Sequence, residues 1–248
     1  MFAPLQAAAV YSASVILIVC PLQHEAAAIR RAVATLKGVQ VVVCGPGQAA
    51  AAAAVDSIAN GPTRPSLVIL AGCAGGLVPS PAVVEIEAVF KERGQTLGTI
   101  TRRFANLPPA HVASIAAPVT TVAAKALLAD RCSQRMSERP ASLIVDTESA
   151  GFKAACERHG LTFAIVRAIS DGPGHALPSG VEHWIDANGR TKLATVLAAL
   201  VRRPWLLPSV VALGRRTNAS LARLGSVLHD ELKAELSRAT SGQNGPRS

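Results

Sequence analysis

The sequence predicts an α/β fold in three layers, with a central, mixed but largely parallel sheet flanked by helices. Three observations support this prediction. Short apolar runs alternate along the chain with segments of helical pattern, which is typical of βα units. These runs are rich in valine, leucine and isoleucine without polar alternation, as expected for strands covered on both faces. Past residue 190 the pattern becomes helical, which predicts a helical C-terminal extension.

The first half of the chain supplies the clearest alternation. Strands and helices are expected to alternate in the order VILIVC (15–20), helix 24–36, VQVVVCG (39–45), helix 48–61 and strand SLVILAG (66–72). The second helix is alanine-rich, with high helix propensity, and it stops at Gly61-Pro62. The first apolar run is expected to be a core strand because no basic segment precedes it, as a signal peptide would require.

The later elements are less regular. The expected strands are AVVEIEAVF (82–90), TLGTI (96–100), SLIVDTES (142–149) and FAIVRAIS (163–170). Helices are expected over 120–135 and, after residue 149, to about His159. The stretch 101–118 contains three prolines and is expected to be irregular. We expect a main domain over 1–201, a helical extension packed on it over 202–240, and a disordered tail over 241–248.

Composition narrows the classes of function. The net charge is +9, but aromatic residues make up only 3%, and the arginines are scattered until the last fifth of the chain. Few side chains can therefore stack on the bases of single-stranded nucleic acid, and no nucleic-acid partner is expected. The five cysteines show no metal-ligand spacing, so we expect reduced thiols, no metal and a cytoplasmic location. No uninterrupted apolar run of about 20 residues predicts a membrane-spanning helix.

Polar or glycine-rich residues follow several predicted strands. They are Cys20-Pro21, Gly45-Pro46-Gly47, the run Gly72-Cys73-Ala74-Gly75-Gly76, Asp146-Thr147-Glu148 and Ser170-Asp171. In open α/β sheets ligands bind beyond the carboxyl ends of the strands, so these residues are expected to line one site. Either glycine loop alone is equally well explained by a tight turn between a strand and a helix.

Asp171 ends an apolar strand immediately before Gly172-Pro173-Gly174. A carboxyl group at such a position, facing a cleft, can act as a general acid toward a leaving group. The structural alternative is an Asx turn that starts the Pro-Gly loop.

Two further carboxylates and one arginine belong to the same predicted site. Glu148 can accept two hydrogen bonds from vicinal hydroxyl groups such as those of a ribose. Favourable charge at a helix N-terminus is the alternative explanation for Glu148, Asp146 and Glu25. Arg167 stands in an otherwise apolar strand, so it must reach the site or pair with a buried carboxylate. Glu25 is the expected partner.

Together, these motifs resemble a known superfamily. GPGQAAAAAA, LAGCAGGL, VDTES and VRAISD, spread over residues 15–171, are similar to the purine nucleoside phosphorylases and the methylthioadenosine/S-adenosylhomocysteine nucleosidases. The segment from His175 to Arg216 resembles the C-terminal region of hopanoid-associated phosphorylases, which are thought to remove adenine from adenosylhopane. The resemblance implies the phosphorylase/hydrolase-like fold and cleavage of the N-glycosidic bond of an adenine nucleoside, without a metal or organic cofactor.

The resemblance also implies roles for individual residues. Asp171 would protonate purine N7, with Ser170 orienting it. Glu148 would bind the ribose 2′- and 3′-hydroxyls, and Glu25 would activate water, with Arg167 orienting it. The residues implied to surround the nucleophile and the sugar are Gly47, Cys73, Ala74, Gly75 and Thr147.

Three positions depart from the family pattern. Thr147 stands where the nucleosidases usually carry a methionine that packs on the ribose, and Cys73 replaces a serine. Leu70 stands where classic hexameric phosphorylases place an arginine. The sequence therefore leaves open whether water or inorganic phosphate, as a co-substrate, is the nucleophile.

Other functions also remain open at this point. The chain can be a methylthioadenosine/S-adenosylhomocysteine nucleosidase, a general purine nucleoside phosphorylase, or a non-catalytic nucleoside- or lipid-binding module on the same fold. The segment around Trp205 is either a packed helix with an arginine-rich outer face or an interfacial segment in peripheral contact with a membrane. The partner implied is a lipid-linked nucleoside, and family analogy implies a homo-oligomer.

Overall fold

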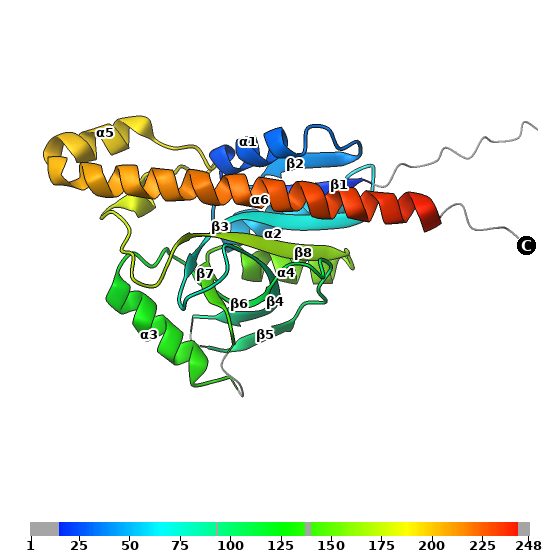
Figure 1. The fold of residues 1–248 in the computed structure, drawn as a ribbon, viewed down its shortest axis with the longest axis horizontal. Coiled ribbons are helices and arrows are strands. Elements are labelled where there is room, and N and C mark those ends of the chain that lie inside the picture. Colours follow the sequence, from blue (N-terminus) through cyan, green and yellow to red (C-terminus); the bar gives the residue numbers. More distant parts are fainter. Residues whose placement is uncertain (1–14, 93, 137–139, 243–248) are drawn as a thin grey trace, which may run out of the picture.

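The computed structural model describes residues 15–92, 94–136 and 140–242 of the chain (Figure 1). Within these residues one eight-stranded sheet forms the centre of the molecule. Its strands are β1 (Ile16–Cys20), β2 (Val39–Val43), β3 (Leu67–Gly76), β4 (Val83–Lys91), β5 (Thr96–Thr99), β6 (Pro109–Ser114), β7 (Leu143–Asp146) and β8 (Phe163–Asp171). The sheet is surrounded by helices α1 (Gln23–Ala32), α2 (Gln48–Ala59), α3 (Val122–Ser133), α4 (Ser149–Arg158), α5 (Leu193–Arg202) and α6 (Leu207–Gly242), with short 3-10 helices η1 (Val181–His183) and η2 (Pro204–Leu206).

The sheet is mixed and largely parallel, as the sequence predicts. Strands β2, β1, β3 and β8 follow one another as parallel neighbours, and β4, β6 and β7 form a second parallel set. Antiparallel pairings of β8 with β4 and of β7 with β3 join the two sets, and β5 adds to β4 as an antiparallel edge. The pairings β3–β8–β4–β6–β7–β3 thus close on themselves, while β1 and β2 extend the sheet to one side.

The predicted irregular stretch 101–118 contains strand β6, so that part of the prediction is wrong. Two prolines in succession argued against a strand. The structure accommodates them because Pro109 is the first residue of β6, where a missing backbone N–H does not interrupt the ladder. The interior residue Val112 then pairs with β4 and β7.

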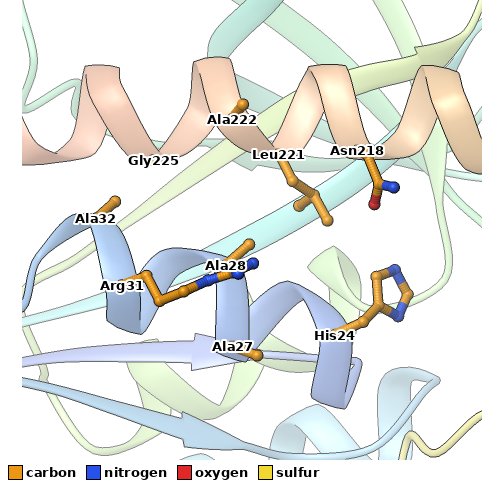
Figure 2. Close-up of a pocket in the computed structure, with 9 residues that line it drawn as sticks. All are labelled: His24, Ala27, Ala28, Arg31, Ala32, Asn218, Leu221, Ala222 and Gly225. Atoms are coloured by element: carbon orange, nitrogen blue, oxygen red, sulfur yellow. The ribbon is translucent and has the colours of Figure 1, made fainter.

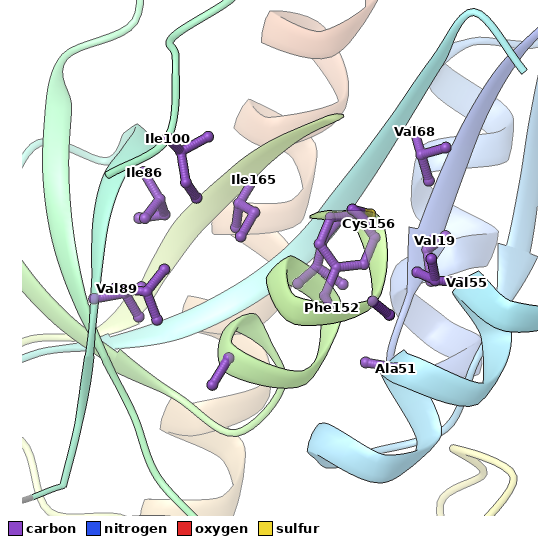
Figure 3. Close-up of a cluster of buried hydrophobic side chains, with 14 of the residues drawn as sticks. Val19, Ala51, Val55, Val68, Ile86, Val89, Ile100, Phe152, Cys156 and Ile165 are labelled. Carbon is purple, nitrogen blue, oxygen red and sulfur yellow. The ribbon is translucent and has the colours of Figure 1, made fainter. Parts of the chain in front are cut away.

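One core lies between the sheet and the pair α2 and α4 (Figure 3). Phe152 and Cys156 of α4 pack there against Val55 of α2 and Val19 of β1, and all four side chains are fully buried. The two helices approach closely at Gly151, where a Cβ would lie 2.1 Å from the carbonyl oxygen of Gln48. This approach explains why small residues dominate the predicted alanine-rich helix.

A second core lies on the opposite side of the sheet, beneath α1 and α6. Leu221, Leu224, Leu228 and Leu232 of α6 are buried in it. Helices α1 and α6 cross closely enough that a Cβ at Gly225 would lie 2.8 Å from the Ala32 methyl group. The middle of α6, from Leu221 to Leu232, is therefore part of the main core.

Two prolines were predicted to interrupt the C-terminal helical region, and only one of them lies at a break between helices. Pro204 lies in η2, at the break between α5 and α6, whereas Pro208 lies in the first turn of α6, where its missing N–H costs no helical hydrogen bond. Residues 241 and 242 still belong to α6; the remainder of the predicted tail, 243–248, lies outside the described residues.

Candidate active site

A cavity of about 700 Å³ lies beyond the carboxyl ends of the strands. Of the ten site residues predicted from sequence, nine line it: Glu25, Gly47, Cys73, Ala74, Gly75, Thr147, Glu148, Ser170 and Asp171. Arg167 does not, because its side chain is fully buried behind the cavity wall. The structure thus brings together residues from the ends of β1, β2, β3, β7 and β8.

Glu25 lies in the first turn of α1 and is only 2% exposed. Its Oε1 accepts a hydrogen bond from the backbone N–H of Cys73 at 2.8 Å, and its Oε2 accepts one from the N–H of Leu22 at 3.1 Å. Burial raises the pKa of Glu25 from 4.5 to about 7, although these hydrogen bonds and the charge of Arg167 oppose the rise. A carboxyl group that titrates near neutrality can take a proton from water, as a general base must.

The Glu25 carboxylate can lie against β3 because position 72 is a glycine. A Cβ on Gly72 would lie 2.8 Å from Glu25 Oε2, closer than side chains approach each other. Farther along β3, a Cβ on Gly75 would lie 3.2 Å from Asp171 Oδ2. The two carboxylates therefore lie against the same strand, with their neighbouring glycines three residues, or roughly 10 Å, apart.

Glu148 joins two turns of the site. Its Oε1 accepts hydrogen bonds from the backbone N–H of Gly47, at 2.9 Å, and from the hydroxyl of Thr147, while its Oε2 accepts one from Arg167 Nη2 at 3.2 Å. Gly47 has a φ of 95°, in the left-handed region that favours glycine. A Cβ on Gly47 would have no neighbour within 4 Å, so a side chain would fit there. It is therefore the backbone conformation, and not a lack of space, that requires glycine at this position.

The partner predicted for Arg167 is wrong. Its guanidinium binds Asp146 Oδ2 through Nε at 3.0 Å and through Nη2 at 2.6 Å, and it also reaches Glu148. The sequence favoured Glu25, which the backbone N–H groups of Leu22 and Cys73 hold instead. Asp146 was predicted to line the site, with a favourable charge near a helix start as the alternative; it does line the cavity, and its Oδ1 also accepts the N–H of Ser149. Arg167 is therefore a positioning residue for Asp146 and Glu148.

Asp171 ends β8 and is 5% exposed. The Ser170 hydroxyl donates to its Oδ1 at 2.7 Å, and Lys125 of α3 forms an ion pair with its Oδ2. Lys125 Nζ also donates to the carbonyl oxygens of Gly172, at 2.9 Å, and of His175, at 3.1 Å. Among the described residues these contacts, rather than an Asx turn, fix the Asp171 carboxylate.

Lys125 is the main residue that the sequence analysis missed. It is 1% exposed, and its three ammonium protons have three acceptors, so it fastens both Asp171 and the loop that follows. In the sequence it lies within AAKALL, where a lysine is typical of the solvent face of a helix. A buried lysine requires a paired acid, but no local pattern identifies one 46 residues away.

The cavity has a polar end and an apolar end. Five carboxylates line it, and none of its described lining residues is a lysine or an arginine. The carboxylates are Glu25, Asp146, Glu148, Asp171 and Glu182. The first four lie at or just after the ends of strands, whereas Glu182 lies in η1. The wall from η1, α5 and α6 is otherwise mainly apolar, with Trp184, Ile185, Val196, Val210 and Leu213.

Two other features limit the chemistry of the site. Burial raises the pKa of the Cys73 thiol well above its ordinary value, so the group is a neutral thiol rather than a nucleophilic thiolate. Among residues 15–92, 94–136 and 140–242, no group of three or more His, Cys, Asp and Glu side chains is placed to hold a metal ion.

A smaller cavity of about 570 Å³ lies between α1 and α6 (Figure 2). Alanines and Gly225 form most of its wall, and His24 and Asn218 at one end also line the main cavity. Its polar groups are few and converge on no common point (Figure 2), so it does not form a second site with recognisable chemistry.

The fold defined by this sheet and its helices is that of the nucleosidases that act on methylthioadenosine and S-adenosylhomocysteine. The 5′-methylthioadenosine/S-adenosyl homocysteine nucleosidase of Helicobacter pylori superposes with a TM-score of 0.59 at 12% identity, over 90% of this chain and 99% of that one. A futalosine hydrolase mutant of the same species gives 0.56 at 14% identity, over 91% and 99% of the two chains. The Neisseria meningitidis nucleosidase gives 0.57 at 14% identity, over 89% and 99%. The sequence matches no protein-family model and no curated protein.

Proposed function

We propose that the protein hydrolyses the N-glycosidic bond of an adenine nucleoside that carries a large apolar 5′ substituent, with adenosylhopane as the substrate. The observation that carries this proposal is the convergence of Glu25, Glu148 and Asp171, from three separate segments, on one cavity with an apolar end. The nucleosidase fold and the resemblance of the C-terminal region to hopanoid-associated phosphorylases support it.

In the proposed reaction, Glu25 takes a proton from a water molecule that attacks C1′ of the ribose. The bond between C1′ and the purine nitrogen N9 breaks, and its electron pair leaves with the base. The buried Lys125–Asp171 pair supplies the proton that purine N7 takes: Asp171 passes it to N7 and receives a proton from the Lys125 ammonium, so the pair ends as a carboxylate beside a neutral amine and regains its proton from solvent after the base leaves. Glu148, held by Gly47 and Arg167, accepts hydrogen bonds from the ribose 2′- and 3′-hydroxyls.

The charge of the cavity favours water over phosphate as the nucleophile. A phosphate dianion requires cationic or N–H-rich partners, whereas this cavity is lined by five carboxylates and, among its described residues, by no lysine or arginine. Leu70, at the position where phosphorylases carry an arginine, is fully buried in the core. The raised pKa of Glu25 supplies a base of suitable strength for water.

The apolar end favours a hydrophobic 5′ group over the short methylthio group. Four of the five carboxylates lie at or just after the ends of strands, and Trp184, Val196 and Leu213 line the part of the cavity formed by the segments after η1. An apolar substituent placed against these side chains would be removed from water, which stabilises the complex in proportion to the area buried.

The second candidate is hydrolysis of methylthioadenosine or S-adenosylhomocysteine, the substrates named for two of the similar structures. A non-catalytic nucleoside- or lipid-binding protein is the third. The buried Lys125–Asp171 pair and the raised pKa of Glu25 weigh against a simple binder, because neither is needed to hold a neutral ligand.

The experiment that tests the proposal is an assay of adenine release. The purified chain is incubated with methylthioadenosine, S-adenosylhomocysteine and adenosylhopane in detergent, each with and without phosphate, and the sugar products are identified by mass spectrometry. We expect the highest kcat/KM for adenosylhopane and a free ribosyl product that is independent of phosphate. Ribose 1-phosphate products would refute hydrolysis, a preference for the soluble substrates would select the second candidate, and no adenine release from any substrate would refute the enzyme.

A further inference from the structure

The helices next to the cavity expose an unusual number of apolar side chains. We define the α5–α6 face as six residues: Leu193, Leu197, Val201, Trp205, Leu207 and Val211. Their exposed fractions run from 42% for Val211 to 83% for Val201, and α5 contains no buried residue. Figure 1 shows α5 and the first turns of α6 at one end of the molecule, beyond the sheet. The face therefore protrudes where an extended partner can reach it.

The segment that carries this face has charges of one sign. Residues 187–229 contain seven lysines and arginines and no aspartate or glutamate, and so contribute +7 of the net charge of +9. The seven are Arg190, Lys192, Arg202, Arg203, Arg215, Arg216 and Arg223. Basic residues that border exposed tryptophan and leucine are typical of segments that lie in the headgroup region of anionic membranes.

The same two helices border the cavity. Val196 of α5 and Val210, Leu213 and Thr217 of α6 line it, while Val201, Trp205 and Val211 of the same segment are exposed to solvent. Only the thickness of α5 and α6 thus separates the apolar end of the cavity from the α5–α6 face. A surface that binds this face would lie next to the part of the cavity assigned to the 5′ substituent.

The shape of the segment favours lying on a bilayer over crossing it. Among the described residues no single helix is long and apolar enough to span a membrane. Taken together, α5 and the helical segment from Pro204 to Arg238 are long and apolar enough to span a membrane, but the two helices meet at a bend of 116°. A bend of this size, with arginines beside it, fits a helical pair that lies in the interface.

We propose that the α5–α6 face docks the protein on an anionic lipid bilayer and brings the apolar end of the cavity beside the lipid phase. The assignment of that end rests on the proposed function; the docking itself rests on the exposed apolar residues and the basic residues of the same segment. A second copy of this chain is the competing occupant, but a like-charged copy would place two sets of seven basic residues together.

Vesicle binding by the full chain tests the proposal. Trp205 is a natural reporter, because it is 70% exposed and the other tryptophan, Trp184, is buried. We expect its emission to shift to the blue with phosphatidylcholine vesicles that contain phosphatidylglycerol, to shift much less with phosphatidylcholine alone, and to recover at high salt. Val201→Glu should weaken binding in a flotation assay by about tenfold or more, because it places a charge in the apolar face. Leu127→Glu is the matched control, since Leu127 is 51% exposed but lies on α3.

The outcomes separate docking from catalysis. Val201→Glu should leave adenine release from a soluble nucleoside unchanged and reduce it only for substrate embedded in vesicles. No binding to anionic vesicles, or equal loss in Leu127→Glu, would overturn the proposal. So would a Val201→Glu variant that changes the oligomeric state in light scattering but still floats with vesicles. Normal vesicle binding without adenine release from any nucleoside would overturn the proposed function and leave the docking proposal standing.

Discussion

Replacing Glu25 with glutamine tests the central electrostatic feature of the site. The pKa of Glu25 is raised from 4.5 to about 7, chiefly by burial. Between these values the folded protein keeps a proton on Glu25 that the unfolded chain releases. The unfolded state then binds fewer protons than the folded one, so this contribution to stability is complete below about pH 4.5 and is lost as the pH rises to about 7.

The magnitude follows from the difference between the two pKa values. Each pH unit of difference corresponds to about 1.4 kcal/mol, so Glu25 should lower the free energy of unfolding by about 3 kcal/mol between about pH 4.5 and pH 7.5. Glu25→Gln removes this dependence. The substitution also leaves one backbone N–H, that of Leu22 or Cys73, facing the amide NH₂ instead of an acceptor, which lowers the free energy of unfolding. This loss is the same at every pH, so it does not affect the difference in pH dependence between the two proteins.

The assay is urea-induced unfolding of both proteins across this range, with Glu92→Gln as a control that removes an exposed carboxylate. The wild type and the control should lose stability with rising pH relative to Glu25→Gln. In the same window wild-type kcat/KM should rise with an apparent pKa near 7, because the base form of Glu25 is the active one. Parallel stability curves for the wild type and Glu25→Gln would refute the raised pKa and with it the proposed role in activating water.

The other predictions concern the base and sugar ends of the site. Asp171→Asn should lower kcat by a factor on the order of 10²–10⁴ with the fold intact by circular dichroism, and near-normal adenine release would dismiss its acid role. Lys125→Met should lower kcat on the order of 10²-fold because Asp171 loses its cationic partner, with partial recovery in Lys125→Arg; equal loss in both variants would indicate a packing role only. Glu148→Gln should raise KM for the ribonucleoside much more than for its 2′-deoxy analogue, and identical changes for both would exclude contact with the 2′-hydroxyl.

Much of the fold was predictable because local patterns are sufficient for it. Runs such as VILIVC and SLVILAG are long, apolar and flanked by turn residues, and the structure confirms them as β1 and β3. Strand β6 escaped prediction because its local sequence, with Pro108 and Pro109, disfavours a strand. The strand forms because β4 and β7 offer it hydrogen bonds on both sides, which no window of sequence contains.

The sequence by itself predicted nine residues of the cavity wall. For those at or after the ends of β1, β2, β3 and β8 the reason is that parallel strands end at the same edge of a sheet. Thr147 and Glu148 follow β7, which is antiparallel to β3, so their place at the site depends on how the sheet closes. Tertiary structure alone decided how these residues are paired. Arg167 binds Asp146 rather than Glu25, and Lys125 reaches Asp171 from a helix 46 residues away in the sequence. The physical reason is that a buried charge takes the partner that the packing of the elements brings within hydrogen-bonding distance, and that distance is set by long-range geometry rather than by residue type or spacing.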